Sequence, residues 1–127
     1  MKDYLQVAKD FMDKARKELE DGKQKRDELS IRDACEKGWG ATVQAINALF
    51  VKKRLSPLPR SHRQRRELLD KLEGEDDQLR EKNFLDRFMA RAYALHERGF
   101  YNGELKVESI ERELEKVEKL IMDIESL

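Results

Sequence analysis

Two histidines and several arginines are the side chains of this 127-residue chain that could carry acid–base chemistry. His96 follows Arg91 by five positions, and His62 lies in a basic segment before them. A histidine can take up or release a proton near neutral pH, and an arginine stabilises phosphate charge. The pair predicts attack by an RNA 2′-hydroxyl, with His96 as base or acid and Arg91 on the phosphate.

A structural role is the alternative for this pair. Five residues of an α-helix turn the chain by about 500°, which leaves the two side chains about 140° apart. They can share a site only if the helix ends near His96, where Gly99 could stop it, or if a second chain completes the site. Otherwise His96 caps the helix end and Arg91 makes a surface ion pair.

The segment 52–66 is the clearest local cationic patch, because the 27 basic and 27 acidic residues of the whole chain cancel. Pro57 and Pro59 break the preceding helix and hold part of the segment extended. The residues expected to contact RNA or nucleotide phosphate are Lys52, Lys53, Arg54, Arg60, His62, Arg63, Arg65 and Arg66. The alternative is a solvated loop, balanced by the acidic stretch 73–77.

Five helices with apolar residues at spacings of three and four are expected to position these side chains. The predicted helices span residues 2–21, 27 or 30 to about 54, 61–73, 76–97 and 106–126. Glycines at positions 22, 74 and 99 are the predicted helix ends. The second helix begins after a cap at either Asp27 or Ser30, and Ser61 with Gln64 caps the third.

Two of these helices carry informative faces. The second accepts Gly38 and Gly40 in its interior, at roughly 1 kcal/mol each relative to Ala, so we expect another helix backbone close by. Trp39 is expected to be a core anchor, with base stacking as the alternative. The last helix repeats apolar residues from Val107 to Ile124 as an a/d seam, which we expect to face the bundle core rather than a partner subunit.

The composition predicts one all-α domain over residues 1–127, a four- to five-helix up-and-down bundle. The single Cys35 indicates a buried thiol in a cytoplasmic protein. No apolar run approaches the roughly 18 residues of a membrane span, so no membrane partner is expected. Because the sequence has no Gly-rich phosphate loop and no Cys/His constellation, it predicts neither cofactor nor metal.

Two stretches resemble the archaeal PaREP-type family, small helical proteins related to the HEPN superfamily (higher eukaryotes and prokaryotes nucleotide-binding domain). The first is ACEKGWGATVQAINALF at 34–50, with an acidic–basic–x–Trp–Gly–Ala run. The second is ALHERGFYNGEL at 94–105, where His96 follows a leucine and precedes the aromatic pair Phe100 and Tyr101. The order of helices agrees with the family over nearly the whole chain.

The resemblance implies a HEPN-like homodimer that binds RNA or nucleotide. Active HEPN proteins are metal-independent ribonucleases in which an Arg and a His a few residues apart meet across the dimer interface. Carried over, this places Arg91 on the phosphate, His96 in acid–base work and Tyr101 among the RNA-contacting residues.

The chain departs from active HEPN proteins at Ala92, where they commonly have Asn, Asp or His, so the resemblance leaves open whether it is an enzyme. Some relatives are toxins paired with a nucleotidyltransferase antitoxin, which would then be a partner. The alternative function is a non-catalytic helical protein-interaction module.

Overall fold

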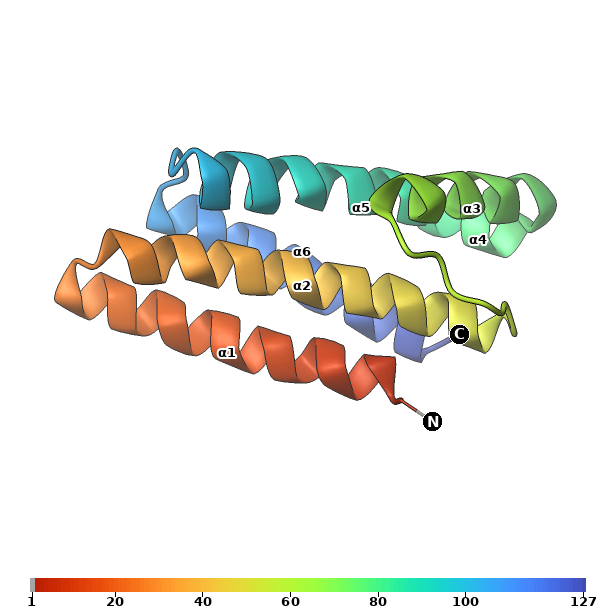
Figure 1. Ribbon diagram of the computed structural model, residues 1–127, viewed down its shortest axis with the longest axis horizontal. Helices are drawn as coiled ribbons and strands as arrows, with labels where there is room; N and C mark the ends of the chain where they lie inside the picture. Colours follow the sequence, from red (N-terminus) through yellow and green to blue (C-terminus); the bar gives the residue numbers. More distant parts are fainter. Residues whose placement is uncertain (1) are drawn as a thin grey trace.

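A computed structural model describes residues 2–127, and this part of the chain is an all-α bundle without a strand (Figure 1). The predicted fold class is therefore confirmed. The helices follow one another as α1 (Tyr4–Lys25), α2 (Glu28–Lys52), α3 (His62–Glu75), α4 (Asp77–Lys82), α5 (Phe84–Arg91), the π-helix η1 (Ala92–Tyr101) and α6 (Val107–Glu125). Across residues 2–127, we find no helix that is both long and apolar enough to cross a membrane.

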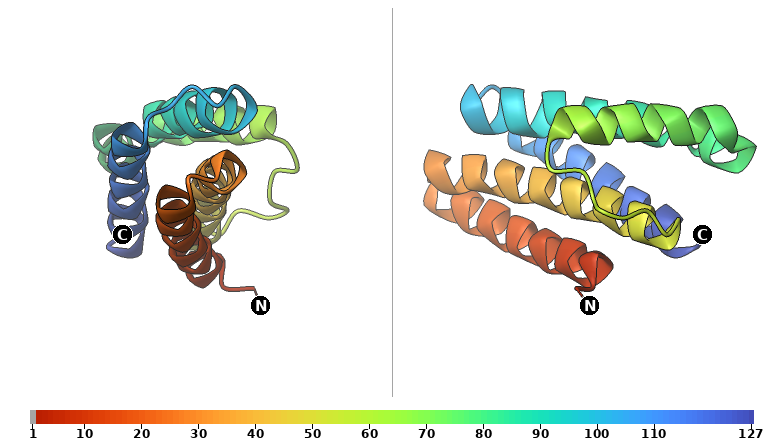
Figure 2. Two further views of the ribbon diagram at one scale, coloured as in Figure 1. Left: turned by 90° about the vertical axis from the view of Figure 1, so that its left-hand side faces the viewer. Right: turned by 45° about the vertical axis from the view of Figure 1, so that its right-hand side comes forward.

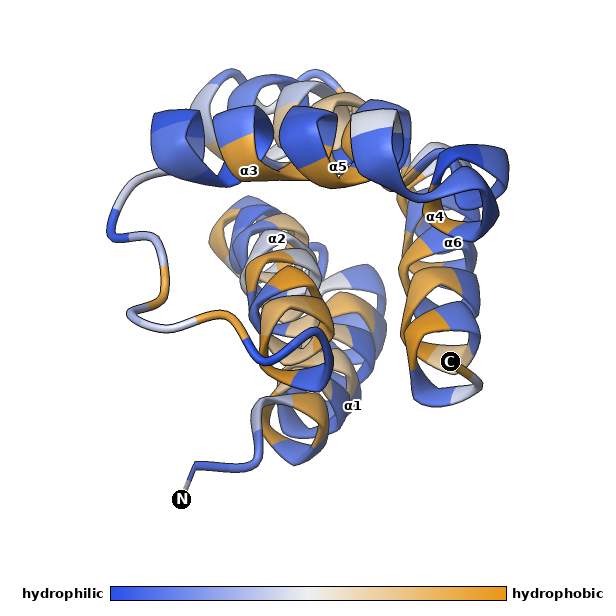
Figure 3. Cartoon of the chain, turned by 90° about the vertical axis from the view of Figure 1, so that its right-hand side faces the viewer, coloured by the Kyte–Doolittle hydropathy of each residue, from blue (hydrophilic) through white to orange (hydrophobic). Residues whose placement is uncertain are grey.

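The central element of the bundle is α2, which contacts α1, α5, η1 and α6. Helices α1 and α2 run antiparallel, and α6 lies against both (Figure 1). The loop after α2 runs back along the molecule before α3 begins, and the segment from α3 to η1 covers the remaining side (Figure 2). The apolar sides of these elements face one another (Figure 3), and fully buried side chains such as Phe50, Phe88 and Leu114 fill the core.

Side-chain caps fix the starts of two helices. Asp27, not Ser30, begins α2: its carboxylate accepts two backbone N–H groups of the first turn and the Ser30 hydroxyl at 2.9 Å. The hydroxyl bond holds the pKa of Asp27 below its ordinary value. Ser61 begins α3 as predicted, because its hydroxyl accepts the Gln64 N–H at 3.1 Å.

The glycines predicted to end helices do not end them. Gly22, Gly74 and Gly99 all lie within helical segments, so these three predictions are wrong. A Cβ atom added to Gly99 would lie 2.6 Å from Cys35 Sγ, so this glycine allows η1 and α2 to approach closely. Helix α1 ends instead at Arg26, which has a left-handed φ of 51°.

The single helix predicted for residues 76–97 is three segments. Asn83, with a left-handed φ of 54°, separates α4 from α5. After Arg91 the helix widens into η1, whose backbone bonds run from residue i to i+5. Such helices are rare and occur frequently at functional sites, and this one carries His96.

Helix α1 packs along α2, so the expected neighbouring helix is present. The two glycines within α2 themselves lie against side chains of neighbouring elements. A Cβ atom at Gly38 would lie 2.6 Å from Leu114 Cδ2 and 3.2 Å from Leu95 Cδ1, and the nearest neighbour of Gly40 is the Phe11 ring. The a/d seam of α6 is buried within the chain, as predicted.

Candidate functional site

A pocket of about 470 Å³ opens between α2, α3, α5 and η1, and both histidines line it. We call it the histidine pocket. Its lining residues are Trp39, His62, Arg66, Phe88, Met89, Ala92, Tyr93, His96, Glu97 and Tyr101. The fold thus gathers residues from four helical segments into one site.

His96 is held by a carboxylate from α2. Its Nδ1 atom lies 3.0 Å from each carboxylate oxygen of Glu36, and both side chains are about one-third exposed, at 33% and 32%. An ionised carboxylate only accepts hydrogen bonds, so Nδ1 carries a proton. In the neutral ring the lone pair is then on Nε2, which has no hydrogen-bonding partner within residues 2–127. A carboxylate-oriented imidazole with one free nitrogen can act as a general base.

His62 has the opposite arrangement of protons. Arg65 Nη1 lies 3.1 Å from His62 Nδ1, and a guanidinium can only donate, so Nδ1 accepts and Nε2 carries the proton. Burial lowers the pKa of His62, and the positive charges of Arg65 and Arg66 lower it further. His62 is therefore a neutral imidazole at pH 7.

Two arginines of this region make no ion pair within residues 2–127. Arg65 is anchored by neutral acceptors, with Nε 3.2 Å from Asn47 Oδ1 and Nη2 3.4 Å from the Pro59 carbonyl. Arg66 lines the pocket itself. In the described part of the chain, neither arginine has an acidic partner within ion-pair distance. An anionic ligand would therefore find unpaired cations here.

The pocket has aromatic walls and an exposed apolar rim. The Trp39 ring centroid lies 5.1 Å from that of His62 and 5.9 Å from that of His96. Trp39 is only 4% exposed, so it is the predicted core anchor as well as a pocket wall. At the rim, Met89, Tyr93 and Tyr101 are 48%, 57% and 62% exposed. Accessible aromatic rings beside cations are typical of sites that stack nucleic-acid bases.

Arg91 is not in this pocket. Its Nε lies 2.9 Å from Glu113 Oε2 on α6, and the two side chains are only 10% and 16% exposed. This is an ion pair without a well-directed hydrogen bond. Within one chain, Arg91 therefore faces α6 while His96 faces α2. The ion pair of Arg91 with Glu113 is buried, and not on the surface as the structural alternative predicted. A catalytic role for Arg91 stays a prediction.

Three residues predicted to contact RNA line the histidine pocket: His62, Arg66 and Tyr101. Arg65, which was also predicted, does not line the pocket but donates a hydrogen bond to His62 Nδ1. These four come from two segments that lie far apart in the sequence, the basic segment and the aromatic pair after His96.

The other residues of the basic segment lie outside the pocket. Lys52 donates to backbone carbonyls at the end of α6, Lys53 pairs with an aspartate of the acidic stretch at 3.4 Å, and Arg63 pairs with a glutamate one turn along α3 at 3.0 Å. Arg54 and Arg60 have no acidic partner in the region described. Lys53 thus makes the kind of contact that the alternative predicted, an ion pair with the acidic stretch 73–77.

Several residues of the site were not singled out from the sequence. Glu36 was named only as part of a family pattern. Nothing in the sequence distinguished four other pocket residues from ordinary helix positions: Phe88, Met89, Tyr93 and Glu97. The one available signal was that Glu36 precedes Trp39 by about one helical turn, on the same face. Among residues 2–127, no three His, Cys, Asp or Glu side chains gather as a metal site would require.

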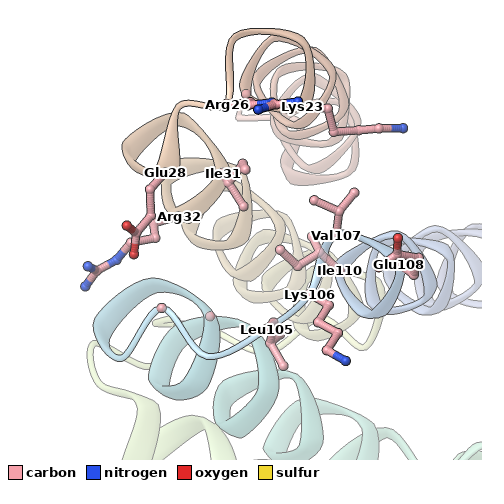
Figure 4. Close-up of a pocket in the computed structure, with 13 residues that line it drawn as sticks. Lys23, Arg26, Glu28, Ile31, Arg32, Leu105, Lys106, Val107, Glu108 and Ile110 are labelled. Carbon is pink, nitrogen blue, oxygen red and sulfur yellow. The ribbon is translucent and has the colours of Figure 1, made fainter.

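A second hollow, of about 580 Å³, lies where the α1–α2 turn meets the connection from η1 to α6 (Figure 4). Isoleucine and valine side chains of α2 and α6 form its floor (Figure 4). Two of its cations are already engaged: Arg32 donates to the carbonyl oxygens of Phe100 and Tyr101, and Lys23 pairs with Glu111 at 3.2 Å. It contains no histidine, so the histidine pocket is the better candidate for chemistry.

Comparison with known proteins places the chain in a family. No curated protein matches it, and no solved structure matches it. The model of the family described as "Archaeal PaREP1/PaREP8 family" matches residues 3–121, a range that includes Glu36 and the whole histidine pocket. The chain therefore belongs to the archaeal PaREP1/PaREP8 family.

Proposed function

We propose that the protein is a HEPN-like RNA- or nucleotide-binding protein that cleaves RNA without a metal ion and acts as a homodimer. One observation carries the proposal: His96 is bound through Nδ1 by Glu36, and its Nε2 has no partner in residues 2–127, in a pocket with aromatic walls and Arg66 at its lining. The resemblance to HEPN proteins and the all-α bundle support the same assignment.

Binding rests on the rings and cations of the histidine pocket. A nucleobase stacks on the exposed rings of Tyr93 or Tyr101, and each stacked base contributes about 1–3 kcal/mol. Arg66 then lies where it can contact the phosphate, because it lines the same pocket and has no acidic partner in residues 2–127. This combination favours single-stranded RNA, whose bases are free to stack.

The proposed reaction uses one base. His96 Nε2 takes the proton of the 2′-hydroxyl, the 2′-oxygen bonds to phosphorus, and the bond from phosphorus to the 5′-oxygen breaks. The imidazolium then returns its proton to the departing 5′-oxygen, which leaves a 2′,3′-cyclic phosphate and a 5′-hydroxyl. Glu36 stabilises the imidazolium while it exists, and Arg66 stabilises the phosphate charge.

The proposed homodimer follows from the HEPN resemblance and from the exposed rim of the pocket. Since Arg91 is buried against Glu113, a composite site that used it would first have to break that ion pair. We therefore assign the phosphate contact to Arg66. A nucleotidyltransferase antitoxin partner is a further expectation of the resemblance.

Cleavage of single-stranded RNA in EDTA tests the catalytic part. Wild-type protein should yield 2′,3′-cyclic ends, and His96→Ala should be slower by about 10²-fold or more. Arg112→Ala, an exposed change on α6 outside the histidine pocket, is the control. Equal activity in wild type and His96→Ala, or no activity in wild type across varied RNAs, would remove the catalytic claim.

Binding has its own measurement, because Trp39 is the only tryptophan and forms a pocket wall. Its fluorescence should change when RNA binds, and the affinity should fall as salt rises. A salt-independent affinity would exclude phosphate contacts.

The second candidate is a non-catalytic protein-interaction module, favoured by the exposed rim of Met89, Tyr93 and Tyr101. Aromatic residues and methionine are enriched at such interfaces. Light scattering on wild type and Tyr93→Ser separates the two functions. A dimer that dissociates in Tyr93→Ser, from a protein that neither binds nor cleaves RNA, would favour the interaction module.

A further inference from the structure

His62 is fixed in one protonation state by its neighbours. Arg65 donates to its Nδ1, and Arg65 is itself anchored by Asn47 and the Pro59 carbonyl, so the guanidinium is held at three points. The proton of His62 is therefore on Nε2, which makes no hydrogen bond inside the described range. Because His62 is exposed and lines the pocket, this N–H donor is accessible to a ligand.

A neutral imidazole N–H is too weak an acid to give up its proton at pH 7, so His62 is not suited to be a general acid. It can donate a hydrogen bond, as neutral histidines do in some enzyme sites. The group that accepts from it must be placed in the same pocket, where Arg66 lies one helical turn further along α3.

The charges that face the two histidines decide what that acceptor is. Glu36 is engaged with His96 Nδ1, and Arg65 with His62. Arg66 contributes one positive charge at the lining and Glu97 one negative charge, while Tyr93 and Tyr101 add neutral rings. Around His62 itself, both nearby charged groups on α3 are arginines, so the free donor adjoins positive charge.

We propose that His62 and Arg66 form a phosphate subsite, in which His62 acts as a neutral hydrogen-bond donor beside the Arg66 guanidinium. This rests on the proposed function, and it specifies which residues receive the phosphate of the nucleotide whose base stacks on the pocket rings. In the reaction, His96 is the only group that exchanges a proton with substrate, and His62 holds the phosphate in place.

Nitrogen NMR of the histidine rings tests the donor state directly, without any ligand. His62 should show the Nε2–H tautomer at pH 7, and His96 the Nδ1–H tautomer. Arg65→Met should remove the single-tautomer state of His62, because Nδ1 loses its donor. A His62 ring that is protonated, or that carries its proton on Nδ1, at pH 7 in wild type would overturn the proposal.

Trp39 fluorescence titrations test the subsite, with uridine and adenosine each compared with its 3′-monophosphate. Wild type should bind the monophosphate about tenfold more tightly than the nucleoside, as expected for a hydrogen bond to a charged group. His62→Phe and Arg66→Gln should each reduce this preference and keep nucleoside binding, because each variant retains the other phosphate contact. His62→Gln, which restores an N–H donor, should recover part of it.

Arg63→Gln is the matched control, since Arg63 is on the same helix but pairs with Glu67 outside the pocket. It should keep the full preference. If no nucleoside or nucleotide binds wild type, the proposed function fails and the subsite with it. If all bind and His62→Phe keeps the preference for the monophosphate, the subsite alone is wrong.

Discussion

His96 Nδ1 lies 3.0 Å from both carboxylate oxygens of Glu36, although sixty residues separate them in the chain. This contact joins η1 to α2. The two elements lie close together because Gly99 of η1 has no Cβ atom to meet Cys35, the residue before Glu36. The position of the proposed base thus depends on close packing one turn away.

Glu36→Gln tests the electrostatic part of this contact. The amide keeps the size of the side chain but lacks the charge that stabilises an imidazolium on His96, so kcat should fall by about 10²-fold or more. RNA binding should stay the same, because Glu36 does not line the pocket. Single-turnover cleavage and Trp39 titration give the two quantities.

Glu97→Gln is the control for that substitution. It removes a carboxylate that does line the pocket but makes no hydrogen bond to His96. Its kcat should stay close to that of wild type. If both variants lose activity equally, then general negative charge, and not the Glu36 contact, supports the reaction.

Gly99→Ala tests the packing part. The new Cβ atom would lie 2.6 Å from Cys35 Sγ and 3.2 Å from the Ala94 carbonyl, so the free energy of unfolding should fall by about 1–3 kcal/mol. Gly74→Ala should raise it by about 0.5–1 kcal/mol, because that glycine lies within α3 and has no atom within 4 Å of the added Cβ.

Urea unfolding measures both changes. Adding Cys35→Ala to Gly99→Ala should recover part of the loss, because it removes the nearest atom. A Gly99→Ala protein as stable as wild type would show that η1 and α2 are further apart than described.

Arg91→Ala distinguishes a structural from a catalytic arginine. It leaves Glu113 buried without its partner, so the free energy of unfolding should fall by about 3 kcal/mol. Arg98→Ala breaks an exposed pair with Glu104 and should cost less than about 1 kcal/mol. Thermal unfolding gives the ranking. An Arg91→Ala protein with wild-type stability and no cleavage would favour a catalytic Arg91.

Acid should destabilise the helix caps. The Ser30 hydroxyl holds the pKa of Asp27 below its ordinary value, and the backbone N–H of Leu79 does the same for the pKa of Asp76. Because each folded-state pKa is below the unfolded one, the stability from these carboxylates is present above about pH 4 and is lost as pH falls through the folded-state values.

The Asp27→Asn and Asp76→Asn double variant keeps the caps but removes this titration. Its urea midpoint should therefore fall less than that of wild type between about pH 6 and pH 3. Asp70→Asn, an exposed change within α3, should follow wild type. Parallel curves for wild type and the double variant would exclude the caps as a source of acid sensitivity.

The sequence predicted the helices because each buries one apolar side, and that spacing is visible locally. It did not predict η1, because the apolar residues of that segment follow the spacing of an ordinary α-helix. Gly99 was misjudged for a related reason. A glycine can end a helix or admit a neighbouring side chain, and only the position of Cys35 decides between them.

The candidate site was predictable only in part. The prediction included His62, Arg66, His96 and Tyr101, because the chemistry of histidine, arginine and tyrosine side chains is known from the residue type alone. Their gathering around Trp39 depends on how the segment from α3 to η1 folds back onto α2, and no local pattern encodes that. The same fold turns Arg91 towards α6.

Arg32 connects the second hollow with the histidine pocket. It lines the hollow of Figure 4 and donates to the carbonyl oxygen of Tyr101, whose ring lines the histidine pocket. A molecule that drew Arg32 away would release the end of η1 and weaken stacking on Tyr101. By thermodynamic reciprocity, a base stacked on Tyr101 would weaken the binding of that molecule at Arg32 by the same coupling free energy.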